Sequence, residues 1–174
     1  CDTPLDNETV GENVYLNIIN RAKKYVYIFT PYLISDNEVI TALCLAAKSG
    51  IDVRIVTPGI PDKKMVFLLT QSYYGTLLQA GVRIFEYKPG FLHAKSFVCD
   101  EIATVGTINL DYRSLYLHFE CGVWLYRSEA VLQIKEDALS IFGQCREIRW
   151  EDWENRSLRT RFFQSVLRLF APLL

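Results

Sequence analysis

The sequence predicts an α/β fold built on one mixed, mainly parallel sheet of about six to eight strands, with helices on both faces. Two observations lead to this prediction. Helical and strand patterns alternate along the first half of the chain, which favours right-handed crossovers between parallel strands. Strand patterns follow one another closely in the second half, which adds antiparallel pairs through short turns.

The first half of the chain supplies the alternating elements. Apolar residues recur at helical spacing before Lys24, and the basic residues at the end of that segment suit the carboxyl end of a helix. Aromatic and β-branched runs mark the strands, and Ser35 or Asp36 can cap the second helix. The expected order is a helix at 9–24, a strand at 25–29, a helix at about 36–48, a strand at 53–56, a helix at roughly 62–80 and a strand at 82–87.

The second half begins with a predicted hairpin that turns at Asp100-Glu101. We expect its strands at 95–99 and 102–105, a further strand at 120–126, and helices at about 128–144 and 151–170. Residues 1–8 are polar and contain proline, so they are interpreted as a lead-in. Residues 1–174 are expected to form a single domain that ends in an amphipathic helix at 151–174.

The composition is that of an ordinary globular domain. The chain has 174 residues, 50% of them hydrophobic, and a formal net charge of −1. These values exclude a disordered chain and a strongly basic protein, so no nucleic-acid partner is expected. No apolar run reaches the length of about 18 residues that a membrane-spanning helix requires.

The five cysteines are odd in number and form no C-x-x-C pair. Cys44 and Cys99 fall in apolar runs, where small buried side chains are common. A reducing compartment without a structural disulfide is therefore the expectation. The chain starts at Cys1, without Met or a signal sequence, and we interpret it as a domain excised from a longer protein.

Two side chains that suit phosphate chemistry stand two residues apart at the start of the predicted hairpin. His93 and Lys95 precede the apolar run 97–99, and residues i and i+2 of a strand share a face. A neutral imidazole can attack phosphorus, and an ammonium group offsets the charge on the phosphate oxygens. The pair therefore indicates nucleophilic chemistry at a phosphate.

Further polar groups follow on the returning strand. Gly106 permits close backbone approach. Thr107 and Asn109, again at i and i+2, offer a hydroxyl and an amide on one face, and we expect them to bind the substrate phosphate. Glu120 can orient and polarise His93, because an activated nucleophile usually requires a third group.

The pattern His93-x-Lys95-x4-Asp100, followed by Gly-Thr-x-Asn at 106–109, resembles the HKD signature of the phospholipase D superfamily. The run GTINLDYRSLYLHFECGVWLY is similar to the carboxy-terminal catalytic half of bacterial cardiolipin synthases, and the resemblance extends over nearly the whole chain. It implies a phospholipase D-like fold and catalytic roles for His93, Lys95, Asp100 and Glu120. The interval between Asp100 and the glycine is one residue shorter than is usual in the family, which can displace Asp100.

The resemblance also implies a reaction. Relatives of this kind transfer a phosphatidyl group between two phosphatidylglycerols through a phosphohistidine, giving cardiolipin and glycerol without a metal or other cofactor. Two motifs are needed, so a second half in the full-length chain or a homodimer is the expected partner. The isolated domain is expected to be weakly active or inactive. The full-length protein would lie at the cytoplasmic face of a bacterial inner membrane, with this fragment soluble.

Other interpretations stay open at this point. Lys95 can protect a sheet edge, Asp100 can be a turn residue, and Glu120 can be an exposed charge. His118 matches no catalytic element and is interpreted as structural. A homodimeric single-motif phosphodiesterase or nuclease shares the signature, and a non-catalytic lipid-binding half-domain is a further alternative.

The carboxy-terminal segment 155–174 contains four arginines and no acidic residue. Its apolar residues recur at helical spacing: Leu158, Phe162, Val166, Leu169 and Phe170. This pattern is typical of a helix on a membrane surface, for which anionic phosphatidylglycerol is a fitting partner. A terminal helix packed on its own domain has the same pattern, so the sequence leaves both interpretations open.

Overall fold

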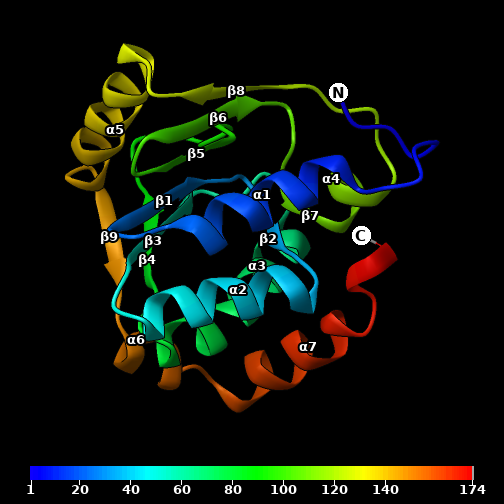
Figure 1. Cartoon of the computed structure of the whole chain (residues 1–174). Coiled ribbons are helices and arrows are strands. Elements are labelled where there is room, and N and C mark those ends of the chain that lie inside the picture. The colour runs from blue at the N-terminus through cyan, green and yellow to red at the C-terminus, as the bar shows by residue number, and fades with distance from the viewer. Residues whose placement is uncertain (174) are drawn as a thin grey trace.

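One large mixed sheet forms the centre of the computed structural model, which describes residues 1–173 (Figure 1). Within these residues the sheet has seven strands in the order β8-β6-β5-β1-β3-β4-β9. They are β1 (Tyr25–Phe29), β3 (Asp52–Pro58), β4 (Arg83–Tyr87), β5 (Ser96–Cys99), β6 (Ile102–Gly106), β8 (Gly122–Tyr126) and β9 (Cys145–Ile148). A separate parallel pair consists of β2 (Leu33–Ile34) and β7 (Leu110–Asp111).

The strand directions correct one part of the predicted fold. The α/β class, the strand number and the helices on both faces are confirmed. The description of the sheet as mainly parallel is wrong, because among the described residues only β1–β3 and β3–β4 pair in parallel and the other four pairs of this sheet are antiparallel. The alternating pattern covers just β1, β3 and β4. The hairpin β5–β6 returns beside β1, and β9, which the sequence analysis missed, pairs antiparallel with β4.

Helices cover both faces of the sheet. They are α1 (Val10–Arg21), α2 (Asn37–Lys48), α3 (Lys64–Gln79), α4 (Tyr112–Tyr116), α5 (Glu129–Phe142), α6 (Trp150–Glu154) and α7 (Leu158–Arg168), followed by the 3₁₀ helix η1 (Ala171–Leu173). The helix expected at 151–170 is instead two helices, α6 and α7. The chain turns between them, and the Ser157 hydroxyl caps α7 by accepting a hydrogen bond from the Thr160 amide at 3.1 Å.

Strand β1 separates two hydrophobic cores. Val26 and Ile28 point into the larger core beneath α1, α2 and α3, whereas Tyr27 and Phe29 point into the core covered by α5. A strand buried on both faces reads as a continuous apolar run rather than an alternating one, which explains the sequence YVYIF. Among residues 1–173, none of the helices combines the length and the hydrophobicity that a bilayer span requires.

The first residues are tied into the fold. Asp2 exchanges two backbone hydrogen bonds of 2.9 Å with Glu120. Its buried carboxylate accepts hydrogen bonds from the amides of Val10, at 3.2 Å, and Gly11, at 2.6 Å, at the start of α1. A carboxylate at this position satisfies helix amides that have no partner within the helix. The interpretation of 1–8 as a lead-in is therefore incomplete, because Asp2 joins α1 to the segment before β8.

Gly106 allows β6 and β8 to approach closely. A Cβ at this position would lie 2.4 Å from the Cys121 carbonyl oxygen and 2.6 Å from the Gly122 Cα, and backbone atoms cannot move aside as a side chain can. We expect Gly106→Ala to lower the free energy of unfolding by about 1–3 kcal/mol. The matched control is Gly90→Ala, because a Cβ there meets nothing within 4 Å. Its effect should stay within about 0.5 kcal/mol. Urea unfolding of both variants measures the difference, and equal stabilities would contradict the prediction.

Candidate active site

The predicted site residues gather where three strands meet at one end of the sheet. Because β5, β6 and β8 are successively antiparallel, the start of β5, the end of β6 and the start of β8 lie together. The Gly106 amide donates to the Lys95 carbonyl at 3.2 Å, and the Thr107 amide donates to the Cys121 carbonyl at 2.8 Å. Segments that are far apart in sequence therefore place Lys95, Thr107 and Glu120 side by side.

His93 and Lys95 are in direct contact. The Lys95 Nζ lies 3.0 Å from His93 Nδ1 and donates to the His93 carbonyl at 2.8 Å. The strand starts only at Ser96, so the pair meets because the lysine side chain folds back, not because of a shared strand face. An ammonium group can only donate, so Nδ1 is the acceptor and the neutral ring carries its proton on Nε2. The imidazole is exposed and open to a substrate.

Two carboxylates balance the charge of Lys95. Partial burial lowers the pKa of the Lys95 ammonium, while the negative charges of Glu120 and Asp111 raise it. Asp111 is itself buried, which raises the pKa of its carboxyl group; hydrogen bonds from Ser114 and Asn109 act in the opposite direction. Sequence reasoning missed Asp111. The available signal was its position two residues after Asn109.

Thr107 holds the carboxylate of Glu120. The Thr107 hydroxyl donates a short hydrogen bond to Glu120 Oε2, and the Cys121 amide donates to the same hydroxyl oxygen at 2.9 Å. The other carboxylate oxygen, Oε1, lies 3.7 Å from Nδ1 of His118. Among residues 1–173 Glu120 therefore contacts Thr107 and His118 rather than His93, and its expected role in orienting His93 stays a prediction. His118, interpreted as structural, neighbours a site carboxylate.

The two residues expected to bind phosphate differ in what they offer. Both donors of Thr107 are already engaged, its amide with Cys121 and its hydroxyl with Glu120. The side-chain oxygen of Asn109 is buried and lacks a hydrogen-bond partner within the described residues. A buried acceptor without a partner is costly and can receive a hydrogen bond from a ligand hydroxyl. The structure thus places both residues at the site, and their contact with phosphate stays a prediction.

Comparison with known proteins assigns the family. A sequence model described as "Cardiolipin synthase, PLD-like domain" matches residues 15–141. The chain belongs to this family. A cardiolipin synthase of Geobacillus kaustophilus is 43% identical over 95% of the chain, and an uncharacterized protein of Streptococcus mutans is 51% identical over 99%. The chain spans 33% and 38% of the lengths of these two relatives, respectively.

Solved structures agree with the phospholipase D-like fold. The phospholipase D family member Nuc from Salmonella typhimurium superposes with a TM-score of 0.67 at 19% identity, covering 79% of this chain and 90% of Nuc. The phosphatidylserine synthase of Haemophilus influenzae superposes with a TM-score of 0.71 at 18% identity, covering 93% of this chain and 42% of the synthase. At such identities the likeness concerns the fold alone.

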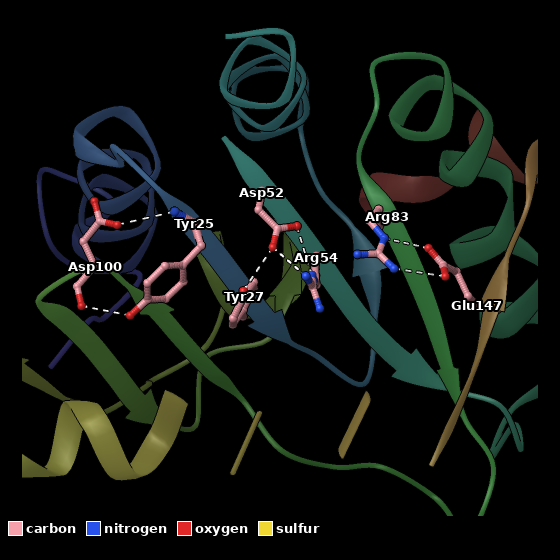
Figure 2. Close-up of polar contacts among 7 residues, drawn as sticks. All are labelled: Tyr25, Tyr27, Asp52, Arg54, Arg83, Asp100 and Glu147. Carbon is pink, nitrogen blue, oxygen red and sulfur yellow. Dashed lines mark hydrogen bonds and ion pairs between the residues drawn. The ribbon is translucent and has the colours of Figure 1, made fainter. Parts of the chain in front are cut away.

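Asp100, the third member of this cardiolipin synthase-like motif, lies away from the others. It lies in the tight turn at the far end of β5. Because a strand rises about 3.3 Å per residue, the five steps from Lys95 to Asp100 correspond to roughly 16 Å. Figure 2 shows it beside Tyr25, where β1 begins, whereas the site lies at the end where β1 finishes. The Asp100 carboxylate accepts hydrogen bonds from the backbone amides of Lys23, at 2.7 Å, and Lys24, at 3.2 Å. The structure therefore does not bring Asp100 together with the expected catalytic group.

This location predicts a structural effect for Asp100. Its φ of 47° is left-handed, a conformation that Asp and Asn tolerate better than Ala. We expect Asp100→Ala to lower the free energy of unfolding by about 1–2 kcal/mol, because it loses the carboxylate acceptor and strains the turn. Asp100→Asn keeps one acceptor oxygen and should lose about half as much. Urea unfolding gives these values, and a fully stable Asp100→Ala protein would speak against a structural role.

Proposed function

We propose that this chain is one catalytic half of a cardiolipin synthase that transfers a phosphatidyl group from one phosphatidylglycerol to another. The observation that carries the proposal is the contact between the His93 imidazole and the Lys95 ammonium, 3.0 Å apart at an exposed position. The family match and the cardiolipin synthase of Geobacillus kaustophilus support the substrate class. Because the chain covers about a third of that relative, the activity is assigned to the larger two-motif protein.

The proposed first step is attack on the phosphodiester. An imidazole, either that of His93 or its counterpart in the second motif, forms a bond to phosphorus while the bond to the glycerol headgroup breaks. The opposite histidine supplies the proton that the departing alkoxide needs. In the second step a hydroxyl of another phosphatidylglycerol attacks the phosphohistidine, and its proton returns to that same acid–base group. Cardiolipin and glycerol are the products, and no net proton is consumed.

In this scheme the Lys95 ammonium can donate a hydrogen bond either to His93 or to the substrate phosphate. In the structure this ammonium donates to Nδ1 of His93, an arrangement that keeps the ring proton on Nε2. A phosphodiester anion competes for the ammonium through charge-assisted hydrogen bonds. When Lys95 turns to the phosphate, Nδ1 is free to carry the ring proton and Nε2 gains the lone pair that attacks. Substrate binding thereby activates the ring that it meets.

Replacement of the contact pair tests the proposal. In a protein that contains both motifs, His93→Ala should lower cardiolipin formation by about a thousandfold or more, because the covalent route is lost. Lys95→Met should act in the same direction. Lys88→Met removes an exposed lysine of the same loop and serves as the matched control. Labelled phosphatidylglycerol reports cardiolipin and glycerol, and normal turnover by a folded His93→Ala protein would refute the assignment.

Incubation of the isolated chain separates the alternatives. We expect little turnover of phosphatidylglycerol by the monomer, because one motif supplies one of the two acid–base groups. The mass in solution is recorded during the same measurement. Cleavage of single-stranded DNA by a dimer would instead identify a single-motif nuclease. Binding of phosphatidylglycerol without turnover by the two-motif protein would identify a lipid-binding half-domain.

The charge of Lys95 predicts a pH dependence. The ammonium must be protonated to bind phosphate, so activity is present below the pKa of Lys95 and is lost as the pH rises through it. Partial burial lowers this pKa from its usual 10.5, and the charge of Glu120 partly restores it. The alkaline limb of kcat/KM, which reports the free enzyme, should therefore lie below pH 10.5. Glu120→Gln should move this alkaline limb to still lower pH, because the negative charge that raises the pKa of Lys95 is lost. An alkaline limb at the same pH in both proteins would contradict the interaction between Glu120 and Lys95.

A further inference from the structure

The carboxy-terminal helix α7 (Leu158–Arg168) turns its most apolar stripe away from the protein. Its buried side carries Gln164 and Leu167, and the Gln164 side chain donates to the Leu68 carbonyl of α3 at 3.1 Å. On the opposite side, Leu158 is 79% exposed, Phe162 is 73% exposed and Leu169, just beyond the helix, is 78% exposed. The helix is therefore packed on its own domain and also carries an uncovered apolar surface.

Helix geometry places these exposed residues in one line. At 100° per residue, Leu158, Phe162 and Leu169 fall within about 40° of one another, roughly opposite the buried Leu167. We call these three residues the α7 stripe. Large exposed apolar side chains that gather on one surface usually mark an interaction site.

Arginines flank the α7 stripe on both sides. On the same wheel, Arg159 lies about 100° to one side of Leu158 and Arg161 about 60° to the other. Both are exposed, and neither forms an ion pair with any residue in 1–173. No acidic residue occurs between positions 155 and 174. This arrangement matches the surface of a bilayer. The apolar stripe can insert among the acyl chains, while the guanidinium groups on both sides stay at the level of the anionic headgroups.

The position of α7 relative to the site fits the same partner. The 3₁₀ helix η1, which follows α7, packs against α4, and its Ala171 is buried. Helix α4 begins directly after Asp111 of the site. Figure 1 shows the carboxyl end of the chain on the side of the molecule that carries α4 and β7. The loop between α4 and Glu120 also exposes Leu117 and Phe119, so uncovered apolar side chains also occur in the segment that leads from α4 to the site carboxylate.

We propose that α7 lies on an anionic phospholipid surface, with the α7 stripe inserted among acyl chains and Arg159 and Arg161 at the headgroups. Charge complementarity selects this occupant: a second protein surface would have to supply acidic groups opposite both arginine margins, whereas phosphatidylglycerol supplies negative charge along the whole helix. The proposal rests on the proposed function only for the identity of the lipid. It adds a docking surface that presents bilayer lipid to the site.

Vesicle binding by a catalytically inactive chain tests the surface. The His93→Ala chain is sedimented with vesicles of equal parts phosphatidylglycerol and phosphatidylcholine, and with vesicles of phosphatidylcholine alone. We expect binding to the anionic vesicles that weakens as salt is added. Adding Leu158→Asp and Phe162→Asp should reduce the partition coefficient at least tenfold, because two apolar side chains no longer insert. Arg159→Gln with Arg161→Gln should also reduce it, by about tenfold, and remove most of the salt dependence.

The matched control lies on α5. Leu132→Asp with Leu139→Asp changes two exposed leucines that are seven residues apart on a helix of the opposite face, and vesicle binding should stay unchanged. Urea unfolding establishes that every variant is folded. Equal binding by the α7 variant, or equal binding to neutral vesicles, would overturn the proposal. So would a dimer without lipid that Leu158→Asp and Phe162→Asp convert to a monomer, since a second copy would then cover the stripe.

This experiment is independent of turnover. If the two-motif protein fails to make cardiolipin while the His93→Ala chain still binds anionic vesicles through α7, the proposed function fails and the docking surface stands. If cardiolipin is made but α7 substitutions leave vesicle binding intact, the docking surface fails and the function stands.

Discussion

The close approach of β6 and β8 at Gly106 is the constraint on which the rest of the site depends. A side chain at this position would strike the backbone of Cys121 and Gly122. With glycine there, the Thr107 amide reaches the Cys121 carbonyl and the Thr107 hydroxyl reaches Glu120. The same strand end holds Lys95 through the Gly106 amide. One missing Cβ thus brings a hydroxyl, a carboxylate and an ammonium group from three segments into a single cluster.

In this cluster the positive charge of Lys95 and the negative charges of Glu120 and Asp111 stabilise one another. Lys95 is partly buried, which disfavours its charged form, and the carboxylates of Glu120 and Asp111 offset that effect. Glu120 is buried as well and is held by Thr107. A buried charge without a partner is expensive, so the cationic and anionic members stabilise one another's charged forms. The site therefore holds a cation whose carboxylate neighbours are already fixed in place.

Much of the fold could be predicted from the sequence because local patterns and tertiary packing agree. The continuous apolar run of β1 reports burial on both faces, and Asp36 caps α2 as its residue type suggests. Strand β9, with sequence CREI, escaped prediction because an edge strand with exposed charged side chains has no alternating pattern. The break between α6 and α7 was missed because apolar spacing continues across it, whereas the backbone of Ser157, with a ψ of 147°, leaves the helical conformation before α7 begins.

The candidate site was predictable to the extent that it is local in sequence. The proximity of His93 and Lys95 follows from a spacing of two residues, although the lysine reaches the ring by folding back. The position of Asp100 could not be read from its motif, because a two-residue turn sends it to the opposite end of β5. The engagement of Glu120 by Thr107 and His118 depends on the register of β6 against β8, which no short motif encodes.

Asp2 has a practical consequence for work with this domain. Its backbone pairs with the residue that supplies the site carboxylate, and its side chain caps the first helix. Deleting residues 1–8, or fusing a bulky tag directly to them, would remove or disturb the contacts by which Asp2 joins α1 to the segment before β8. A loss of stability in such a shortened protein would then come from the choice of its first residue and not from a defect in the sheet.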